Sequence, residues 1–304
     1  MIEATRLTKR YGAKTAVDDA TFTVRPGIVT GFLGPNGAGK STTMRMIVGL
    51  DNPTSGAVTI NGAPYSALRA PLREVGILLD AKAVHPGRSA RGHLRALAAT
   101  HGIPQRRVDE VIGLTGLDSV AGKRVKGFSL GMGQRLGIAA ALLGDPATLI
   151  LDEPVNGLDP EGVIWVRQLA RFLASEGRTV FLSSHLMSEM AQTADHIIVL
   201  GRGRVIADAP VAEIVASAAG TGAVRVRSPH ADRLVAAIAA ENGAATPDAS
   251  GLVVTGIPSE RIGELAARDG IVLHELTPVA GSLEDAYLAL TQDEVEYHAG
   301  GEAA

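Results

Sequence analysis

Residues 34–42 read GPNGAGKST, and this stretch decides the fold of the chain. It matches the phosphate-loop pattern G-x-x-x-x-G-K-[ST], in which a glycine-rich turn connects a buried strand to a helix. The apolar run Ile28–Leu33 predicts that strand, and the residues from Lys40 onward predict the helix. A glycine-rich turn without a ligand is the alternative. The strand before it and the helix after it are the context that a phosphate site requires.

Each residue type in this stretch suits a nucleotide phosphate and its Mg²⁺ ion. Glycines let the backbone curl so that its N–H groups point inward, and the helix directs its positive end at the anion. Lys40 supplies a point charge for the β- and γ-phosphates, and the Ser41 hydroxyl is a candidate Mg²⁺ ligand. The stretch therefore provides seven candidate nucleotide-binding residues: Gly34, Asn36, Gly37, Gly39, Lys40, Ser41 and Thr42.

A second element follows further along the chain. Residues Thr148–Leu151 (TLIL) predict a buried strand, which ends in the adjacent carboxylates Asp152 and Glu153. Asp152 can reach the shell of a Mg²⁺ ion through water, and Glu153 can polarise an attacking water molecule. Solvated acids at the end of a strand are common, so the pair alone decides nothing. Downstream of a phosphate loop, the pair favours nucleotide hydrolysis.

Outward from these motifs, predicted strands alternate with predicted helices. Further strands are expected at 56–60, 75–79, 179–183 and 196–200. Helices are expected at 161–176 and 186–194, and a mainly helical subdomain at about 82–140. This alternation predicts an α/β fold of the P-loop NTPase type with a mainly parallel, doubly wound sheet.

Composition excludes several classes of protein. Hydrophobic residues make up 46% of the chain and aromatic residues 3%, which predicts an aliphatic core. The net charge of −3 gives no overall field that favours nucleic acid, so none is expected as a partner. The chain has no cysteine, which excludes disulfides and thiolate metal sites. The longest apolar stretch, Leu136–Leu151, is interrupted by Asp145-Pro146, and no membrane span or signal region is expected.

The character of the sequence changes after about residue 216. Ala216–Gly222 is small and glycine-containing, which is typical of a linker. Beyond it, 217–292 predict a compact accessory α/β domain, and 293–304 a flexible tail. The elements expected in this domain are strands at 223–227, 252–255 and 271–276 and helices at 229–241, 259–268 and 282–290.

With these motifs in this order, residues 1–216 resemble the nucleotide-binding subunit of ABC transporters. Phe128–Met132 (FSLGM), followed by Gln134-Arg135, stands where that family has its signature sequence LSGGQ. Leu130 and Met132 replace a glycine and a glutamine. Ser129 and Gly131 remain, and the resemblance implies that they bind nucleotide. In the family this loop begins a helix whose N-terminus meets the γ-phosphate held by the opposite subunit.

The resemblance also implies roles for single residues. Tyr11 would stack on adenine, although a half-buried strand tyrosine is the plain alternative. His185, in Ser183-Ser184-His185, matches the switch histidine that contacts the γ-phosphate, although a histidine at a strand end is often an ordinary surface residue. Glu153 would be the general base, with His185 and Lys40 stabilising charge in the transition state. Gly157-Leu158-Asp159 matches the loop that communicates between the two sites.

Asp80 is the main departure from the family pattern. The family usually has a glutamine after the strand at this position, where it touches Mg²⁺ and links the site to the membrane subunit. A carboxylate is a stronger ligand for Mg²⁺ than an amide, but aspartate is shorter by one methylene group. Two roles for Asp80 stay open: it joins Ser41 and Asp152 as a metal ligand, or it serves only in coupling to the membrane subunit. The role as a metal ligand is favoured.

The resemblance implies a function and its partners. Two copies would bind two ATP molecules, each with Mg²⁺, in a head-to-tail homodimer, and closure followed by hydrolysis would drive a separate transmembrane permease. The subunit would be cytoplasmic, on the inner face of the cell membrane. Ser282–Tyr287 (SLEDAY) resembles the ending of bacterial drug- and antibiotic-export ATPases, including those similar to daunorubicin exporters, which favours export. A generic amphipathic helix is an equal alternative for this segment.

Two other functions use the same phosphate loop. A soluble ABC ATPase could act on a ribosome or on DNA, but such relatives usually carry two nucleotide modules or long coiled coils, and neither is found here. A GTPase or kinase would lack the signature loop, and a GTPase would carry an Asn-Lys-x-Asp base-reading motif, which is absent.

Overall fold

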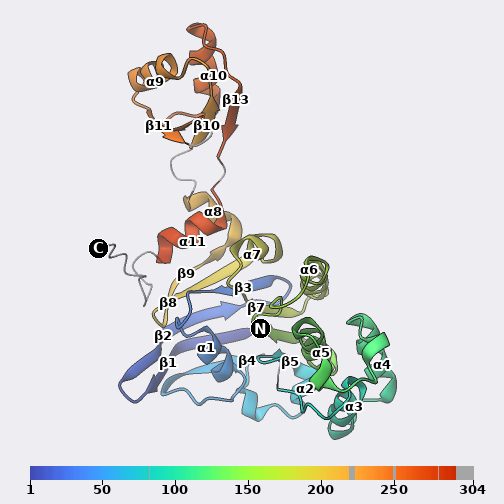
Figure 1. The fold of residues 1–304 in the computed structure, drawn as a ribbon. Helices are drawn as coiled ribbons and strands as arrows, with labels where there is room; N and C mark the ends of the chain where they lie inside the picture. Colours follow the sequence, from blue (N-terminus) through green and yellow to red (C-terminus); the bar gives the residue numbers. More distant parts are fainter. Residues whose placement is uncertain (82, 219–222, 249–250, 280, 292–304) are drawn as a thin grey trace, which may run out of the picture. The chain divides into compact units, whose positions relative to one another are not determined.

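The computed structural model describes residues 1–81, 83–218, 223–248, 251–279 and 281–291 (Figure 1). The chain divides into two compact units, one built mainly from Met1–Val211 and the other from Ala212–Ala289. The expected tail at 293–304 and residues 219–222 of the expected linker lie outside the described residues. The linker was expected from Ala216, but helix α8 (Val211–Ala218) continues through that point, since alanine favours helix.

A six-stranded sheet forms the centre of the first unit, and it confirms the predicted parallel core. The order is β5-β6-β7-β3-β8-β9, and every neighbouring pair is parallel except β8 with β9. The strands are β3 (Val29–Leu33), β5 (Val75–Leu78), β6 (Thr148–Leu151), β7 (Thr179–Ser183), β8 (His196–Gly201) and β9 (Arg204–Pro210). The carboxyl ends of β3, β6 and β7 meet at one edge, where α/β proteins place their ligands.

A second, antiparallel sheet was not predicted as a separate layer. Its order is β2-β1-β4, from β1 (Ile2–Tyr11), β2 (Lys14–Val24) and β4 (Ser55–Ile60). The ring of Phe22 of this sheet packs against the rings of Phe32 and Phe181 of the parallel sheet, with centroid distances of 5.9 and 6.2 Å. The two sheets therefore share one apolar core, and it includes the buried face of α1 (Lys40–Ile47).

The region from 82 to 140 is mainly helical, as predicted. It holds α3 (Ala90–Thr100), α4 (Gln105–Leu114) and most of α5 (Leu130–Leu142). The side chains of Ser89 and Ser129 accept N–H groups at the starts of α3 and α5, an arrangement that stabilises a helix by about 1 kcal/mol. The first unit also contains α2 (Pro71–Glu74), α6 (Pro160–Ser175) and α7 (Met187–Thr193). Among the described residues, no helix combines the length and hydropathy needed to cross a membrane.

The second unit carries a four-stranded antiparallel sheet in the order β11-β12-β10-β13. Its strands are β10 (Val224–Arg227), β11 (Ala244–Asp248), β12 (Gly251–Thr255) and β13 (Glu275–Pro278), and its central helices are α9 (Ala231–Ala240) and α10 (Ser259–Arg268). The order along the chain is β-α-β-β-α-β, a split βαβ arrangement. The unit has its own apolar core, and α11 (Leu283–Thr291) follows it in sequence.

Two predictions for this unit were wrong. The strand expected at 271–276 begins only at Glu275, because Ile271 closes the end of α10 by donating its N–H to the carbonyl of Ala266 (2.8 Å). Strand β11 was missed because its sequence, AATPD, lacks the β-branched pattern and contains Pro247. Proline is tolerated there because β11 is an edge strand.

Candidate active site

The phosphate loop lies between β3 and α1, as predicted, and neighbouring backbone leaves no room for side chains at two of its glycines. A Cβ atom at Gly34 would lie 2.4 Å from the carbonyl oxygen of Leu200, and one at Gly39 would lie 2.3 Å from that of Ala16. Gly39 also has a φ of +103°, which disfavours any side chain. The loop is therefore clamped between β8 and β2, which preforms the curve of a phosphate cradle.

Lys40 folds back onto this loop. Its side chain is 8% exposed, and its ammonium donates to the carbonyl oxygens of Gly34 (2.6 Å) and Pro35 (3.2 Å). Burial lowers the pKa of the Lys40 ammonium, while the charges of Glu153 and Asp152 act in the opposite direction. A buried cation held only by carbonyl oxygens is well placed to accept an anionic phosphate as its partner.

Asp152 joins the phosphate loop to the neighbouring strand. Its Oδ2 accepts a hydrogen bond from the Ser41 hydroxyl (2.9 Å), and its Oδ1 accepts one from the Ser183 hydroxyl (2.5 Å). Ser183 is fully buried and also accepts the main-chain N–H of Glu153 (2.9 Å). Sequence reasoning gave Ser183 no role of its own. Its position at the end of β7, beside the end of β6, is the signal that could have identified it.

Glu153 and His185 are brought together. The His185 Nδ1 lies 2.8 Å from Glu153 Oε2. The His185 side chain is 53% exposed and the Glu153 side chain 24%. Gln134, from α5, donates its amide N–H to the main-chain carbonyl of Glu153 (2.7 Å). The sequence showed Gln134 only as the residue that follows the signature-like loop. The His185 side chain therefore orients the Glu153 carboxylate. Ser183 and Gln134 hold the main chain of Glu153 at its N–H and its carbonyl.

The residues fit a Mg²⁺ site that is completed by phosphate. The Ser41 hydroxyl and the Asp152 carboxylate are adjacent hard oxygen donors, and Mg²⁺ is commonly held by one or two carboxylates together with phosphate oxygens and water. Asp80 follows β5, which pairs in parallel with β6, so Asp80 and Asp152 leave the same edge of the sheet. Across the described ranges, no three His, Cys, Asp or Glu side chains converge on a possible metal position. Asp80 therefore completes no carboxylate cluster here, and its metal role stays a prediction.

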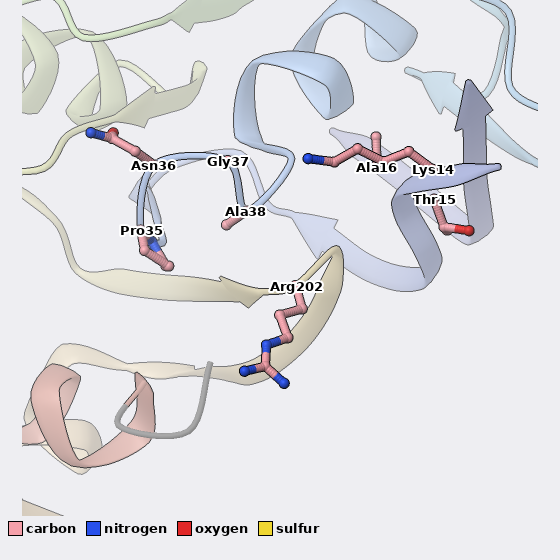
Figure 2. A pocket seen from close by; sticks show the side chains of 8 residues that line it. All are labelled: Lys14, Thr15, Ala16, Pro35, Asn36, Gly37, Ala38 and Arg202. Carbon is pink, nitrogen blue, oxygen red and sulfur yellow. The ribbon is translucent and has the colours of Figure 1, made fainter. Parts of the chain in front are cut away.

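A hollow of about 230 Å³ lies beside the outer part of the phosphate loop (Figure 2). Figure 2 shows the Lys14 side chain extended toward the loop. Sequence reasoning missed four residues that line this hollow with the loop: Lys14, Thr15, Ala16 and Arg202. Three of them come from the start of β2 and one from the β8–β9 turn, which only the fold brings next to residues 35–38.

Tyr11 lies at the end of β1 with half of its surface exposed. Its hydroxyl donates to Asp51 Oδ2 (3.0 Å), and Asp51 also pairs with Arg45 of α1 (2.8 Å). The Lys9 ammonium lies 5.0 Å from the ring centroid. The hydroxyl therefore ties Tyr11 to the end of the helix that begins at the phosphate loop. Stacking on adenine stays a prediction.

Ser129 and Gly131 lie at the start of α5. The Ser129 side chain accepts the N–H of Met132 (3.2 Å), and a Cβ at Gly131 would lie 2.8 Å from the carbonyl oxygen of Gly157. Only glycine at 131 therefore lets the signature-like loop approach the 157–159 loop so closely. Asp159 in turn accepts the N–H of Gly162 (2.9 Å) at the start of α6. The expected contact of Ser129 and Gly131 with a nucleotide on a second subunit stays a prediction.

Comparison with known proteins identifies relatives of both parts of the chain. Residues 17–156 match the family model described as ABC transporter, and residues 222–284 match a domain of unknown function. The bacitracin transport ATP-binding protein BcrA of Bacillus licheniformis is 43% identical over 213 residues, which cover 69% of this chain and 70% of the relative. The Nod factor export ATP-binding protein I of Rhizobium sp. (strain N33) is 33% identical over 305 residues, which cover 97% and 98%.

Solved structures show the same fold. An ATP-binding subunit of an ABC transporter is 28% identical, with a TM-score of 0.63 over 71% of this chain and 92% of that one. A dimeric bacterial ABC transporter cassette is 24% identical, with a TM-score of 0.64 over 69% and 99%, and at that identity it shows the fold alone. The chain belongs to the ATP-binding subunits of ABC transporters and is an ATPase of that family.

Proposed function

We propose that this chain hydrolyses ATP in a head-to-tail homodimer and thereby drives export through a separate transmembrane permease. The similarity to the Nod factor export protein supports export, because it extends over 97% of this chain and so includes the second unit. The subunit would lie on the inner face of the membrane, held there by the permease.

One observation carries the catalytic part of the proposal. A continuous set of hydrogen bonds runs from Ser41 of the phosphate loop through Asp152 and Ser183 to Glu153 and His185. Ligand-binding, proton-accepting and polar side chains are thus fixed relative to one another by hydrogen bonds within the chain. Preorganisation of this kind is the main way an enzyme stabilises developing charge.

Roles follow from this geometry. Ser41 and Asp152 would hold Mg²⁺, which when bound neutralises phosphate charge. Lys40 would exchange its two carbonyl partners for phosphate oxygens. Glu153 would accept a proton from the attacking water, and His185 would keep its carboxylate aimed and contact the γ-phosphate. Tyr11, Gly34, Asn36, Gly37, Gly39 and Thr42 would complete the binding site, and Ser129 and Gly131 would close the site of the second copy.

Glu153→Gln tests the proposal. The substitution keeps the shape of the side chain but removes the proton acceptor, so ATP binding should persist while hydrolysis falls about 10²–10⁴-fold. With ATP bound and not hydrolysed, the variant should accumulate as a stable dimer, which size-exclusion chromatography would detect. Glu176→Gln, at an exposed position after α6, is the matched control and should hydrolyse ATP normally. Near-normal turnover in Glu153→Gln would remove Glu153 from this role.

A further inference from the structure

Glu153 has an unusual backbone conformation. Its φ is +49°, in the left-handed region that residues with a side chain rarely adopt. Such a conformation is strained and persists only where the surroundings enforce it. It lies directly after the buried strand β6, at the residue proposed as the base. The groups that enforce it therefore also decide where the carboxylate points.

Two hydrogen bonds from side chains support this conformation, one on each side of the residue. The N–H of Glu153 donates to Ser183 Oγ (2.9 Å), and its carbonyl oxygen accepts the amide N–H of Gln134 (2.7 Å). The Gln134 side chain is only 5% exposed. The same carbonyl also accepts the main-chain N–H of Asn156, at the longer distance of 3.2 Å. Loss of the Gln134 amide would therefore remove the shorter of these two hydrogen bonds and the one that comes from α5.

Gln134 reaches Glu153 from the helix that begins at the signature-like loop. Ser129 caps this helix, α5, and Gln134 lies just over one turn further along. Glycines let α5 approach the end of the sheet: a Cβ at Gly137 would lie 2.5 Å from the Leu78 side chain. With a larger residue at 137, either the Leu78 side chain or α5 would have to move.

We propose that Gln134 is a positioning residue for Glu153, and that it makes the aim of the base depend on the position of the signature helix in the same subunit. This inference rests on the proposed role of Glu153. Without the hydrogen bond from Gln134, the Glu153 carbonyl is held less firmly, and Glu153 can relax toward the extended region that a residue before proline favours, which swings its Cα–Cβ bond. Any shift of α5 along its axis moves the donor and has the same effect.

Gln134→Leu removes the donor and keeps a side chain of similar size. Because the Gln134 amide donates to the main chain of Glu153 and the phosphate loop is left intact, the affinity for ATP and the KM should stay within about threefold of wild type. The kcat should fall about 10–100-fold, as expected when a catalytic group is displaced by a fraction of an ångström to 1 Å. The control is Gln105→Leu. Gln105 is the exposed first residue of α4, and its amide oxygen accepts a hydrogen bond from Arg95. A kcat for Gln134→Leu equal to that of the control would overturn the inference.

Gln134→Glu supplies a second readout that does not depend on how well the leucine variant folds. An ionised carboxylate cannot donate and repels the carbonyl oxygen of Glu153, whereas a protonated carboxyl donates to it. Burial raises the pKa of a carboxyl group in such a position. The ratio of the variant's kcat to that of wild type should therefore rise as the pH is lowered from 8.5 toward 6. A ratio that stays constant over this range would overturn the inference.

The double variant Gln134→Leu/Glu153→Gln separates the inference from the proposed function. If Gln134 acts through the base, its removal should cost nothing further once the base is gone, so the two effects on kcat should be non-additive. Additive losses would show that Gln134 acts elsewhere. An inactive Glu153→Gln beside a fully active Gln134→Leu would overturn only this inference. A fully active Glu153→Gln would overturn the role of Glu153 itself.

Discussion

The Nδ1 atom of His185 lies 2.8 Å from Oε2 of Glu153, although the two residues are 32 positions apart in the chain. An ionised carboxylate only accepts hydrogen bonds, so Nδ1 is the donor of this pair. This arrangement leaves Nε2 as the atom that can meet a nucleotide. His185 would therefore orient the Glu153 carboxylate through Nδ1 and contact the γ-phosphate through Nε2.

His185→Ala should therefore damage hydrolysis more than binding. Loss of one preorganised donor commonly reduces kcat about 10²–10³-fold, and the affinity for ATP should change only a few-fold because the phosphate loop is intact. The measurements are phosphate release and titration with a fluorescent ATP analogue. His101→Ala, at the exposed end of α3, is the matched control. Equal turnover in the two variants would show that His185 is an ordinary surface residue.

Lys40→Ala should weaken ATP binding itself, because the ammonium acts on the bound nucleotide as well as on the transition state. The exposed Lys123→Ala is the control and should bind ATP like wild type. An unchanged affinity in Lys40→Ala would contradict the role of Lys40 in the phosphate cradle.

Lys40 also predicts a pH dependence with a definite sign. Burial lowers the pKa of this ammonium in the free protein, and a bound phosphate favours its charged form. The contribution of Lys40 to affinity is therefore complete below the lowered pKa and is lost as the pH rises through it. Wild-type affinity for ATP, titrated from pH 7 upward, should show this decline. The Lys40→Ala variant should lack it, and a decline of equal size in both would assign it to another group.

Asp80 is tested by the Mg²⁺ dependence of hydrolysis. If Asp80 acts in the metal shell, Asp80→Gln should retain much of the activity, because an amide oxygen can replace the carboxylate, and Asp80→Ala should need clearly more Mg²⁺. Asp118→Ala, at an exposed position in the helical region, is the control. The same Mg²⁺ dependence in Asp80→Ala and wild type would leave Asp80 a role in coupling alone.

The two compact units predict that the chain can be shortened. A chain ending at Ala218, the last residue of α8, keeps the residues that form the phosphate loop, both sheets of the first unit and the hydrogen-bond set around Asp152. It should be folded and bind ATP within about threefold of the full chain. Circular dichroism and titration with the ATP analogue check this. An insoluble chain that binds no nucleotide would show that the units depend on each other for folding.

Local pattern was enough to predict the strand–turn–helix around Lys40, the buried strand before Asp152 and the mainly helical character of the 82–140 region. These elements rest on short-range signals: runs of apolar residues, glycines in turns and serine caps at helix starts. Strand β11 was missed because its own residues carry no such signal and the strand forms by pairing with β12. The antiparallel layer of β1, β2 and β4 was missed for a related reason, since periodicity predicts strands but not which strands pair.

The sequence by itself determined that phosphate, a hydroxyl and two carboxylates belong to one site, because that pattern is encoded in two short stretches, 34–42 and 148–153. Only the tertiary structure decided which groups hold those carboxylates in place. Ser183 and Gln134 are 31 and 19 residues away from their partners Asp152 and Glu153, and an isolated serine or glutamine has no recognisable pattern. The parallel register of β6 and β7 and the close approach of α5 bring them within hydrogen-bond distance, and neither can be read from a single stretch of chain.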